Sequence, residues 1–250
     1  MKKVVATLEA RMASTRLPGK VLSDMGGISS LECQVNRVRK SKLIDEIIIA
    51  STKNPLDDAI EEFGELIDCK VYRGSEEDVL KRILSASEFL NGDIQVQLTG
   101  DCPLVDPEII DDLIQFILEN EEYDFVSNEI ERTYPIGLDC RVFDVSALRK
   151  ADSLCSDPMH RVHGSTYLYA KENNHLFKCK NFEAPLSLFY PEWRWTLDTA
   201  EDQLFLEKIF LFFGKRIFDV TSLEIATFLR HNPDILLLNK DIRQKRIEEG

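Results

Sequence analysis

The sequence lacks a long apolar run. None of its apolar stretches reaches the roughly 18 residues that a membrane-spanning helix needs. Two lysines precede the apolar stretch Val4 to Leu8, but the charges of Glu9 and Arg11 end it before it could serve as the core of a signal peptide. We therefore expect no membrane partner, and we interpret residues 4–8 as the first β-strand of a cytoplasmic protein.

Paired cysteines and an excess of positive charge are also lacking. The six cysteines are scattered without a Cys-x-x-Cys pair, which argues against a zinc ribbon or a redox motif. Acidic residues outnumber basic ones by 44 to 31, and the formal net charge is -13. Such a surface repels nucleic acid, so we expect no nucleic-acid partner. A small anionic substrate remains compatible with this charge if a few basic residues converge in one cleft.

Strand-length apolar runs alternate with segments of helical period in the first half of the chain. We predict strands at residues 4–8, 46–51, 70–72, 94–98 and 124–127, and helices at residues 28–38, 57–66, 77–89 and 107–118. This alternation predicts an α/β three-layer sandwich with a mostly parallel sheet between two layers of helices. Ligands of such sheets bind beyond the carboxyl ends of the strands.

The pattern changes from about residue 130. We predict a turn at residues 134–137, an edge strand at 138–143, a helix within 157–173, an irregular aromatic segment at 176–195, and helices at 200–213 and 222–229. We interpret residues 1–240 as one domain with an inserted region at about 130–195 that forms a dimer contact or covers the substrate. Residues 241–250 form a charged tail that we expect to fray.

The first candidate site is the segment ARMASTRLPGK, which directly follows the first predicted strand. Arg11, Arg16 and Lys20 place three cations within ten residues of an acidic chain, and Ser14 is small enough for backbone N–H groups to approach an anion. A triphosphate needs both features. The segment differs from a Walker loop, because a serine stands where the first glycine belongs. The alternative is a solvated basic turn.

Three aspartates are candidates for metal binding or helix capping. Asp101 follows a glycine at the end of the strand predicted at 94–98, where a carboxylate can bind a hard cation, although an ordinary turn aspartate is the simpler alternative. Asp106 precedes a proline and is predicted to cap the following helix. Asp198 lies between a strand-like piece and a helix, where it either caps the helix or binds a metal.

Four segments together resemble the cytidylyltransferase family, which includes the 3-deoxy-manno-octulosonate and acylneuraminate cytidylyltransferases, and in particular its branch named after a spore-coat polysaccharide biosynthesis protein. They are residues 10–20 (ARMASTRLPGK), 73–80 (RGSEEDVL), 99–107 (TGDCPLVDP) and 196–202 (TLDTAED). The resemblance, which spans about residues 4–210, implies a fold of the nucleotide-diphospho-sugar transferase type. It also implies a magnesium-dependent enzyme, expected to be a homodimer, that transfers CMP from CTP to an acidic sugar for surface polysaccharide or glycan synthesis and releases pyrophosphate.

The resemblance also assigns roles to individual residues. The catalytic groups would be Lys20, Arg16 and Asp101, and Mg²⁺ would be held by Asp101 and Asp198. The CTP phosphates would be bound by Arg11, Ser14, Arg16 and Lys20, with Arg73 and Ser75 near the base or ribose. The acceptor would be contacted by Gln97, Asn128, Arg141 and His163. A structural role is the alternative for a single His or Asn.

Two positions depart from the pattern of this branch. Ile136 stands where an acidic residue is usual, and Arg141 stands in place of a glutamate. Arg141 therefore contacts an anion on the acceptor or forms a surface salt bridge, and the acceptor stays open between a 2-keto-3-deoxy sugar acid and a phosphorylated polyol. The sequence also leaves room for a glycosyltransferase, although the Asp-x-Asp motif of that class is missing here. A silent binding module is the last reading, and Lys20, Asp101 and Asp198 argue against it.

Overall fold

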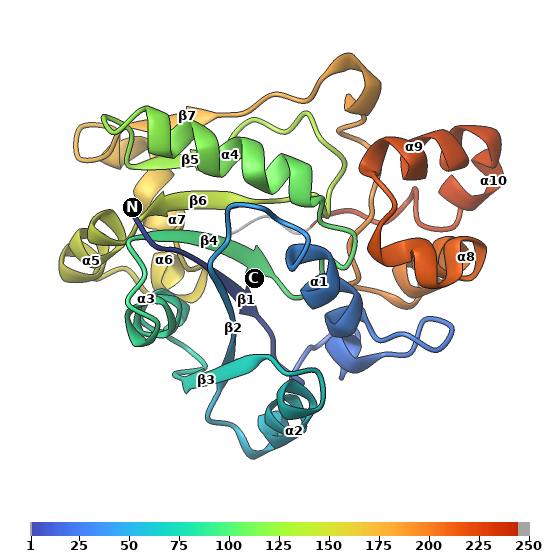
Figure 1. Ribbon diagram of the computed structural model, residues 1–250, viewed down its shortest axis with the longest axis horizontal. Helices are drawn as coiled ribbons and strands as arrows, with labels where there is room; N and C mark the ends of the chain where they lie inside the picture. Colours follow the sequence, from blue (N-terminus) through green and yellow to red (C-terminus); the bar gives the residue numbers. More distant parts are fainter. Residues whose placement is uncertain (1, 245–250) are drawn as a thin grey trace.

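The computed structural model describes residues 2–244, and within them seven strands form one sheet in the order β3-β2-β1-β4-β6-β5-β7 (Figure 1). The strands are β1 (Val4–Glu9), β2 (Glu46–Thr52), β3 (Lys70–Gly74), β4 (Ile94–Thr99), β5 (Phe125–Ser127), β6 (Arg141–Asp144) and β7 (Cys179–Asn181). The first four strands pair in parallel, whereas β6 runs antiparallel to both β4 and β5. The predicted α/β fold with a mostly parallel sheet is therefore confirmed.

Helices cover both faces of the sheet. One face packs against α1 (Ser30–Val38), α2 (Asp58–Leu66), α4 (Pro107–Glu119), α8 (Ala200–Phe213) and α9 (Ser222–His231). The other face packs against α3 (Val79–Phe89), α5 (Val145–Leu154) and α7 (Thr166–Tyr169), with α6 (Pro158–Val162) beside α3. The short helix α10 (Pro233–Leu236) contacts α8 and α9. None of the helices within residues 2–244 is long and apolar enough to cross a membrane.

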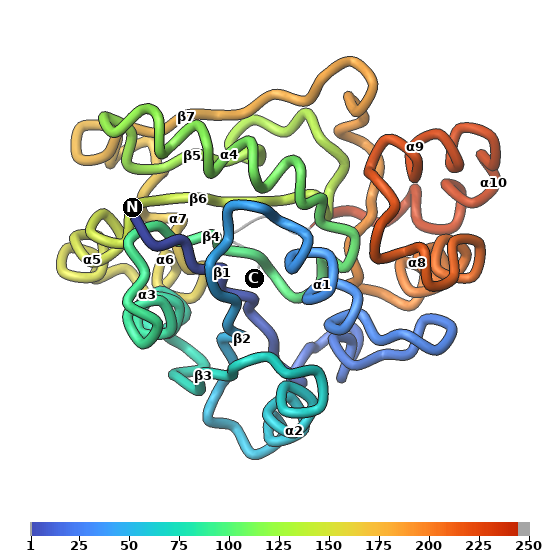
Figure 2. Tube along the Cα trace, viewed as in Figure 1, coloured from blue at the N-terminus to red at the C-terminus, as the bar shows by residue number. Residues whose placement is uncertain are grey.

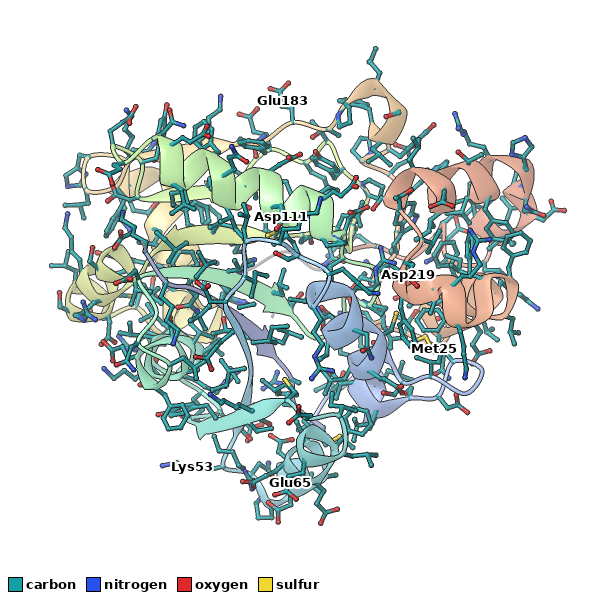
Figure 3. All side chains as sticks on the ribbon, viewed as in Figure 1. Met25, Lys53, Glu65, Asp111, Glu183 and Asp219 are labelled. Carbon is teal, nitrogen blue, oxygen red and sulfur yellow. The ribbon has the colours of Figure 1, made fainter. Side chains whose placement is uncertain are left out.

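The C-terminal helices return to the N-terminal part of the chain. In Figure 2 the red tube of α8 and α9 lies beside the blue tube of α1 and of the loop before it. Met25, in that loop, is fully buried and lies next to α8 in Figure 3. Arg37 of α1 is also fully buried, and its guanidinium donates to the backbone oxygens of Val105, Ile217 and Val220. The bonds to Ile217 and Val220 tie α1 to the segment that connects α8 and α9, and the bond to Val105 ties it to the loop before α4.

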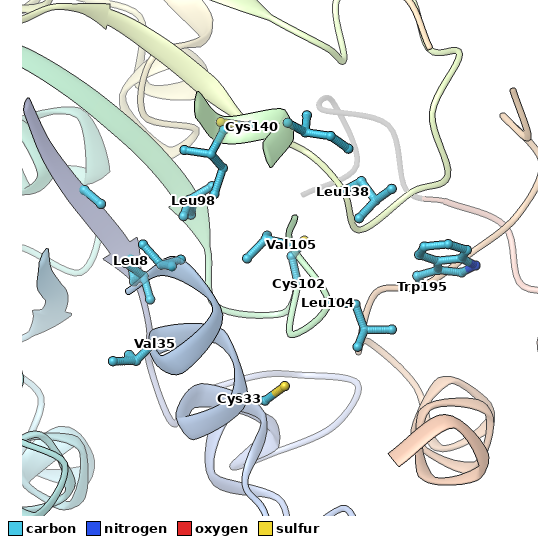
Figure 4. Packing of buried hydrophobic residues seen from close by; sticks show 14 of the residues in the cluster. Leu8, Cys33, Val35, Leu98, Cys102, Leu104, Val105, Leu138, Cys140 and Trp195 are labelled. Atoms are coloured by element: carbon cyan, nitrogen blue, oxygen red, sulfur yellow. The ribbon is translucent and has the colours of Figure 1, made fainter. Parts of the chain in front are cut away.

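The two faces of the central strands differ in polarity. Successive side chains of a strand point to opposite faces. Leu8 and Leu98 pack on the face shown in Figure 4, together with Val35, Cys102 and Trp195. On the opposite face the same two strands carry polar side chains: the Gln95 side chain donates to the Thr7 hydroxyl at 2.8 Å, and the Gln97 side chain donates to the Glu9 carboxylate. A row of buried polar groups therefore runs along β1 and β4 towards their carboxyl ends.

Three predictions for the second half of the chain are wrong. The strand predicted as an edge is β6. It pairs on both sides, because it inserts antiparallel between β4 and β5 although it follows both in the chain. The helix predicted within 157–173 is broken into α6 and α7, because Gly164 adopts φ 65° and ends the helical path. The segment predicted as irregular contains β7, which pairs with β5 and forms the edge of the sheet within residues 2–244. Most of the predicted tail lies outside the described residues.

Candidate active site

A cavity of about 680 Å³ lies beyond the carboxyl ends of β1 and β4. Its lining comes from the loop after β1, the end of β4, the beginning of α3, the turn after α6, and Asp198. This is where ligands bind to parallel α/β sheets. A cavity of about 650 Å³ at the opposite ends of β1 and β2 contains none of the predicted site residues.

Lys20 lies between two carboxylates in this cavity. Its Nζ is 2.9 Å from Oδ2 of Asp101 and 2.7 Å from Oδ1 of Asp198, and Arg16 Nη2 lies 3.1 Å from the same oxygen of Asp198. Burial opposes the charge on Lys20, but the two carboxylates outweigh it and raise the pKa of the ammonium. Burial likewise opposes ionisation of Asp101, yet Lys20 holds the pKa of that carboxyl below its usual range. Lys20 and Asp101 are therefore both charged at neutral pH.

The second oxygen of Asp198 is fixed from behind by Arg194. Arg194 Nη2 lies 2.7 Å from Oδ2 of Asp198, and its Nε lies 2.8 Å from the fully buried carboxylate of Asp202. Asp202 also completes a capping box with Thr199, which is the N-cap of α8. Asp198 is therefore not the cap, and its Oδ1 is presented to the cavity. Asp106 does cap α4, as predicted, by accepting from the backbone N–H of Glu108.

Asp101 reaches Lys20 because a glycine, Gly100, directly follows β4. The Gly100 N–H donates to the backbone oxygen of Glu9 at 2.8 Å, and a Cβ on Gly100 would lie 2.5 Å from that oxygen. A larger residue would therefore push the two strand ends apart. The backbone oxygen of Asp101 accepts from the Thr196 hydroxyl at 3.0 Å and from the Leu197 N–H at 2.8 Å. These bonds join the segments that carry Asp101 and Asp198.

The structure brings together seven of the residues singled out from the sequence. The cavity is lined by Arg11, Ser14, Arg16, Lys20, Asp101, His163 and Asp198. Arg73 and Ser75 do not line it. The Arg73 guanidinium is bound instead by the carboxylates of Asp58 and Glu61, and the Ser75 hydroxyl accepts from the backbone of Asp78.

The other predicted acceptor residues form contacts within the protein. The Asn128 side chain bonds to the backbone of Leu138 and Cys140, which fixes the loop before β6. Gln97 lies behind the cavity, where it donates to Glu9 and accepts from the Ser165 hydroxyl.

Arg141 is neither a surface residue nor part of the cavity lining. Its guanidinium pairs with the buried carboxylate of Glu129 and lies 5.9 Å from the ring centre of Tyr169. Burial opposes its charge, but Glu129 outweighs that effect and raises the pKa of Arg141. The surface salt bridge considered from the sequence is therefore a mostly buried ion pair.

Four charged residues that line the cavity were not assigned a role from the sequence: Glu9, Glu76, Glu77 and Arg82. Glu9 is the last residue of β1, and burial raises the pKa of its carboxyl despite the nearby Arg82. Arg82 lies on α3 and is 4% exposed. Glu9 could have been found from the sequence, because it is a charged residue at the end of the first predicted strand. Arg82 gave no such signal, because a single arginine in an amphipathic helix normally points to solvent.

The comparisons with known proteins agree with the geometry of this site. The sequence model of the cytidylyltransferase family matches residues 5–189. The chain belongs to the cytidylyltransferase family. It is 32% identical over 240 residues to the spore coat polysaccharide biosynthesis protein SpsF of Bacillus subtilis, an alignment that covers 94% of this chain and 97% of the relative.

Two further proteins are similar to this cytidylyltransferase, one in sequence over about half of the chain and one in structure over nearly all of it. A 3-deoxy-manno-octulosonate cytidylyltransferase of Pelobacter propionicus is 32% identical over 117 residues, which cover 47% of this chain and 45% of the relative. The solved structure of a cytidylyltransferase from Leptospira borgpetersenii superposes with a TM-score of 0.87 at 33% identity and covers 98% of this chain and 100% of that one. The similarity to the Leptospira structure extends over the whole fold.

The cavity of this cytidylyltransferase has the donor set that a magnesium ion shared with phosphates would use. Within residues 2–244, no group of three or more His, Cys, Asp or Glu side chains is arranged to hold a metal alone. Mg²⁺, however, usually takes one or two carboxylates and completes its shell with water and substrate phosphates. Asp101 and Asp198 converge on one cation already, the ammonium of Lys20. The two carboxylates therefore fit the ion that the family implies.

Proposed function

We propose that this protein transfers CMP from CTP to a sugar acid, with Mg²⁺ held by Asp101 and Asp198, and releases pyrophosphate. The observation that supports this most is the convergence of Lys20, Arg16 and the two aspartates at one cavity, although they come from three distant segments. Cations for a triphosphate and carboxylates for a divalent ion are the two requirements of nucleotidyl transfer.

The reaction forms a bond between an acceptor hydroxyl oxygen and the α-phosphorus of CTP, and it breaks the bond from that phosphorus to the bridging oxygen of pyrophosphate. Negative charge grows on the leaving pyrophosphate. Arg11, Arg16 and Lys20 would bind the phosphates and stabilise this charge, and Lys20 would exchange its carboxylate partners for phosphate oxygens. Mg²⁺ would supply additional positive charge at the same oxygens. The protein thus acts by positioning and electrostatics.

The choice of a sugar acid as acceptor rests on relatives and on charge. The Pelobacter relative is named for an octulosonate, and the Bacillus relative is named for polysaccharide biosynthesis. Arg82 and His163 add basic groups to the lining of the cavity from outside the loop that carries Lys20. A phosphorylated polyol remains the second candidate, because the same groups can bind a phosphate. The homodimer also stays a prediction.

The experiment measures pyrophosphate release from CTP by the full chain with MgCl₂ and a panel of acceptors: 3-deoxy-manno-octulosonate, N-acetylneuraminate, a polyol phosphate and a neutral hexose. We expect release with CTP and an acid, no release with GTP, and loss of release in EDTA. Asp101→Asn serves as the inactive reference. Pyrophosphate release with the polyol phosphate alone would show that the acceptor is a phosphorylated polyol and not a sugar acid. An absence of both CTP binding and pyrophosphate release would refute the proposal.

A further inference from the structure

Arg82 is a buried cation that lines the cavity and takes part in none of the ion pairs among the described residues. It is 4% exposed, and its Nη1 donates to the backbone oxygens of Ser75 at 2.6 Å and Glu76 at 3.4 Å. Its Nε has no hydrogen-bond partner among the residues that the structure describes. No carboxylate within residues 2–244 forms an ion pair with it. The carboxylates of Glu9, Asp57 and Glu76 favour its charge without forming an ion pair with it, and its contacts leave the guanidinium able to bind a further acceptor.

Other buried cations of this protein are neutralised or enclosed. Lys20 and Arg194 each contact two carboxylates. Arg37 is bound by three backbone oxygens deep in the core and does not line the cavity. Burying a charge is costly unless it is paired. Arg82 alone among these four combines incomplete pairing with access to the cavity, and burial lowers the pKa of its guanidinium. An anionic ligand would complete its surroundings.

Glu9 is the second charged group in this part of the cavity. It lines the cavity close enough to Arg82 for each charge to influence the other, although the two side chains form no ion pair. Gln97 and Ser165 hold its carboxylate in place through a chain of hydrogen bonds. An anion bound to Arg82 would therefore be attracted by the guanidinium and repelled by Glu9.

We infer that Arg82 is the specificity-determining cation that binds the carboxylate of the acceptor, and that Glu9 limits the strength of this binding. The inference rests on the proposed CMP transfer, because it concerns the second substrate of that reaction. It takes the place of the role that the sequence suggested for Arg141, whose guanidinium is occupied by Glu129. The loop of residues 10–20 remains the site of the CTP phosphates, so Arg82 and CTP binding are separable.

The test compares Arg82→Gln, Arg82→Lys and Glu9→Gln with the control Arg149→Gln, which removes an exposed arginine paired with Glu88. KM and kcat are measured for 3-deoxy-manno-octulosonate, N-acetylneuraminate and the carboxamide of each acid. CTP affinity is measured by calorimetry with Mg²⁺. Arg82→Gln should raise the KM of the acid about 10- to 100-fold, the size of a lost charged hydrogen bond, with a smaller change in kcat.

The pattern across ligands distinguishes this role from a structural one. Arg82→Gln should leave the KM of the carboxamide and the affinity for CTP within about twofold, and Arg82→Lys should recover part of the loss for the acid. Glu9→Gln should lower the KM of the acid several-fold and leave the carboxamide unchanged, because it removes a repelling charge. Glu9→Gln is thus expected to lower the KM that Arg82→Gln raises, so it tests the inference even if Arg82→Gln does not fold.

Specific results would overturn the inference. They are an equal loss for acid and carboxamide, a loss confined to CTP binding, or an unchanged KM for the acid in both Arg82→Gln and Glu9→Gln. A wild-type enzyme that binds CTP but neither binds nor converts any acid would also overturn it. CMP transfer to a neutral acceptor would leave the proposed transfer reaction standing, whereas failure to bind CTP would count against the proposed function itself.

Discussion

Lys20 and Arg82 line the same cavity, but their charges are balanced in different ways. Lys20 lies 2.9 and 2.7 Å from two carboxylates, whereas the acceptors of Arg82 within residues 2–244 are backbone oxygens. A ligand at Lys20 must therefore replace existing partners, while a ligand at Arg82 adds a missing one. Under the proposed function, CTP would therefore bind at Lys20 by exchange of ionic partners, whereas the acceptor anion would bind at Arg82 directly.

The largest expected effect follows from removing a carboxylate beside Lys20. We predict that Asp101→Asn and Asp198→Asn each lower kcat by at least about 100-fold, the scale of losing a charge-stabilising group. Asp101→Asn is the cleaner variant, because Asp198 also neutralises the buried Arg194. Turnover at saturating Mg²⁺ is the measurement, and the exposed Asp234→Asn is the control. Near-normal turnover in either variant would remove that residue from the metal site.

Lys20→Ala tests the other member of the same contact. We expect it to weaken CTP binding and to slow the chemical step about ten- to a hundredfold, because the ammonium binds charge that grows during the reaction. Single-turnover kinetics and CTP titration measure the two effects. Lys208→Ala on the exposed side of α8 serves as the matched control. A change confined to the KM of the acceptor would show that Lys20 does not bind the CTP phosphates.

Arg141 provides a contrast with Arg82, because its charge is already paired. We predict that Arg141→Ala lowers the free energy of unfolding by about 3 kcal/mol, since it leaves the carboxylate of Glu129 buried without a partner. The KM ratio between acid and carboxamide acceptors should stay unchanged. Urea denaturation and acceptor kinetics check this. A stable variant with a selective loss for the acid would restore Arg141 to the acceptor site.

The smallest effect concerns the stability cost of Glu9. Burial raises the pKa of its carboxyl above the usual 4.5, although Arg82 of α3, Gln97 of β4 and Arg141 of β6 oppose the shift and Asp101 adds to it. The folded state therefore holds the proton more tightly than the unfolded state. The free energy of unfolding falls as the pH rises from 4.5 through the raised pKa of Glu9. Glu9→Gln should be more stable than the wild type at pH 7 and equal to it below about pH 4.5. Melting temperatures across this range would show whether the difference disappears in acid.

Local patterns in the sequence were enough for the first half of the fold. The strands between residues 4 and 99 are short segments rich in apolar residues, and helices of clear periodicity separate most of them, so this alternation predicted a parallel sheet. The second half was predicted poorly. Neither the insertion of β6 between β4 and β5 nor the pairing of β7 with β5 depends on local composition. Both depend on contacts between segments far apart in the chain.

The candidate site also contains some residues that the sequence predicted and others that only the structure revealed. The sequence by itself predicted that Arg11, Arg16, Lys20 and Asp101 lie together, because motifs at the ends of parallel strands meet at one edge of the sheet, and the family resemblance added Asp198. Only the tertiary structure decided which other charges face the cavity. The guanidinium of Arg141 is paired with Glu129 away from the cavity, whereas Arg82 and Glu9 line it. The physical reason is that a motif records which residues are adjacent in the chain, whereas the balance of a buried charge depends on every segment packed around it.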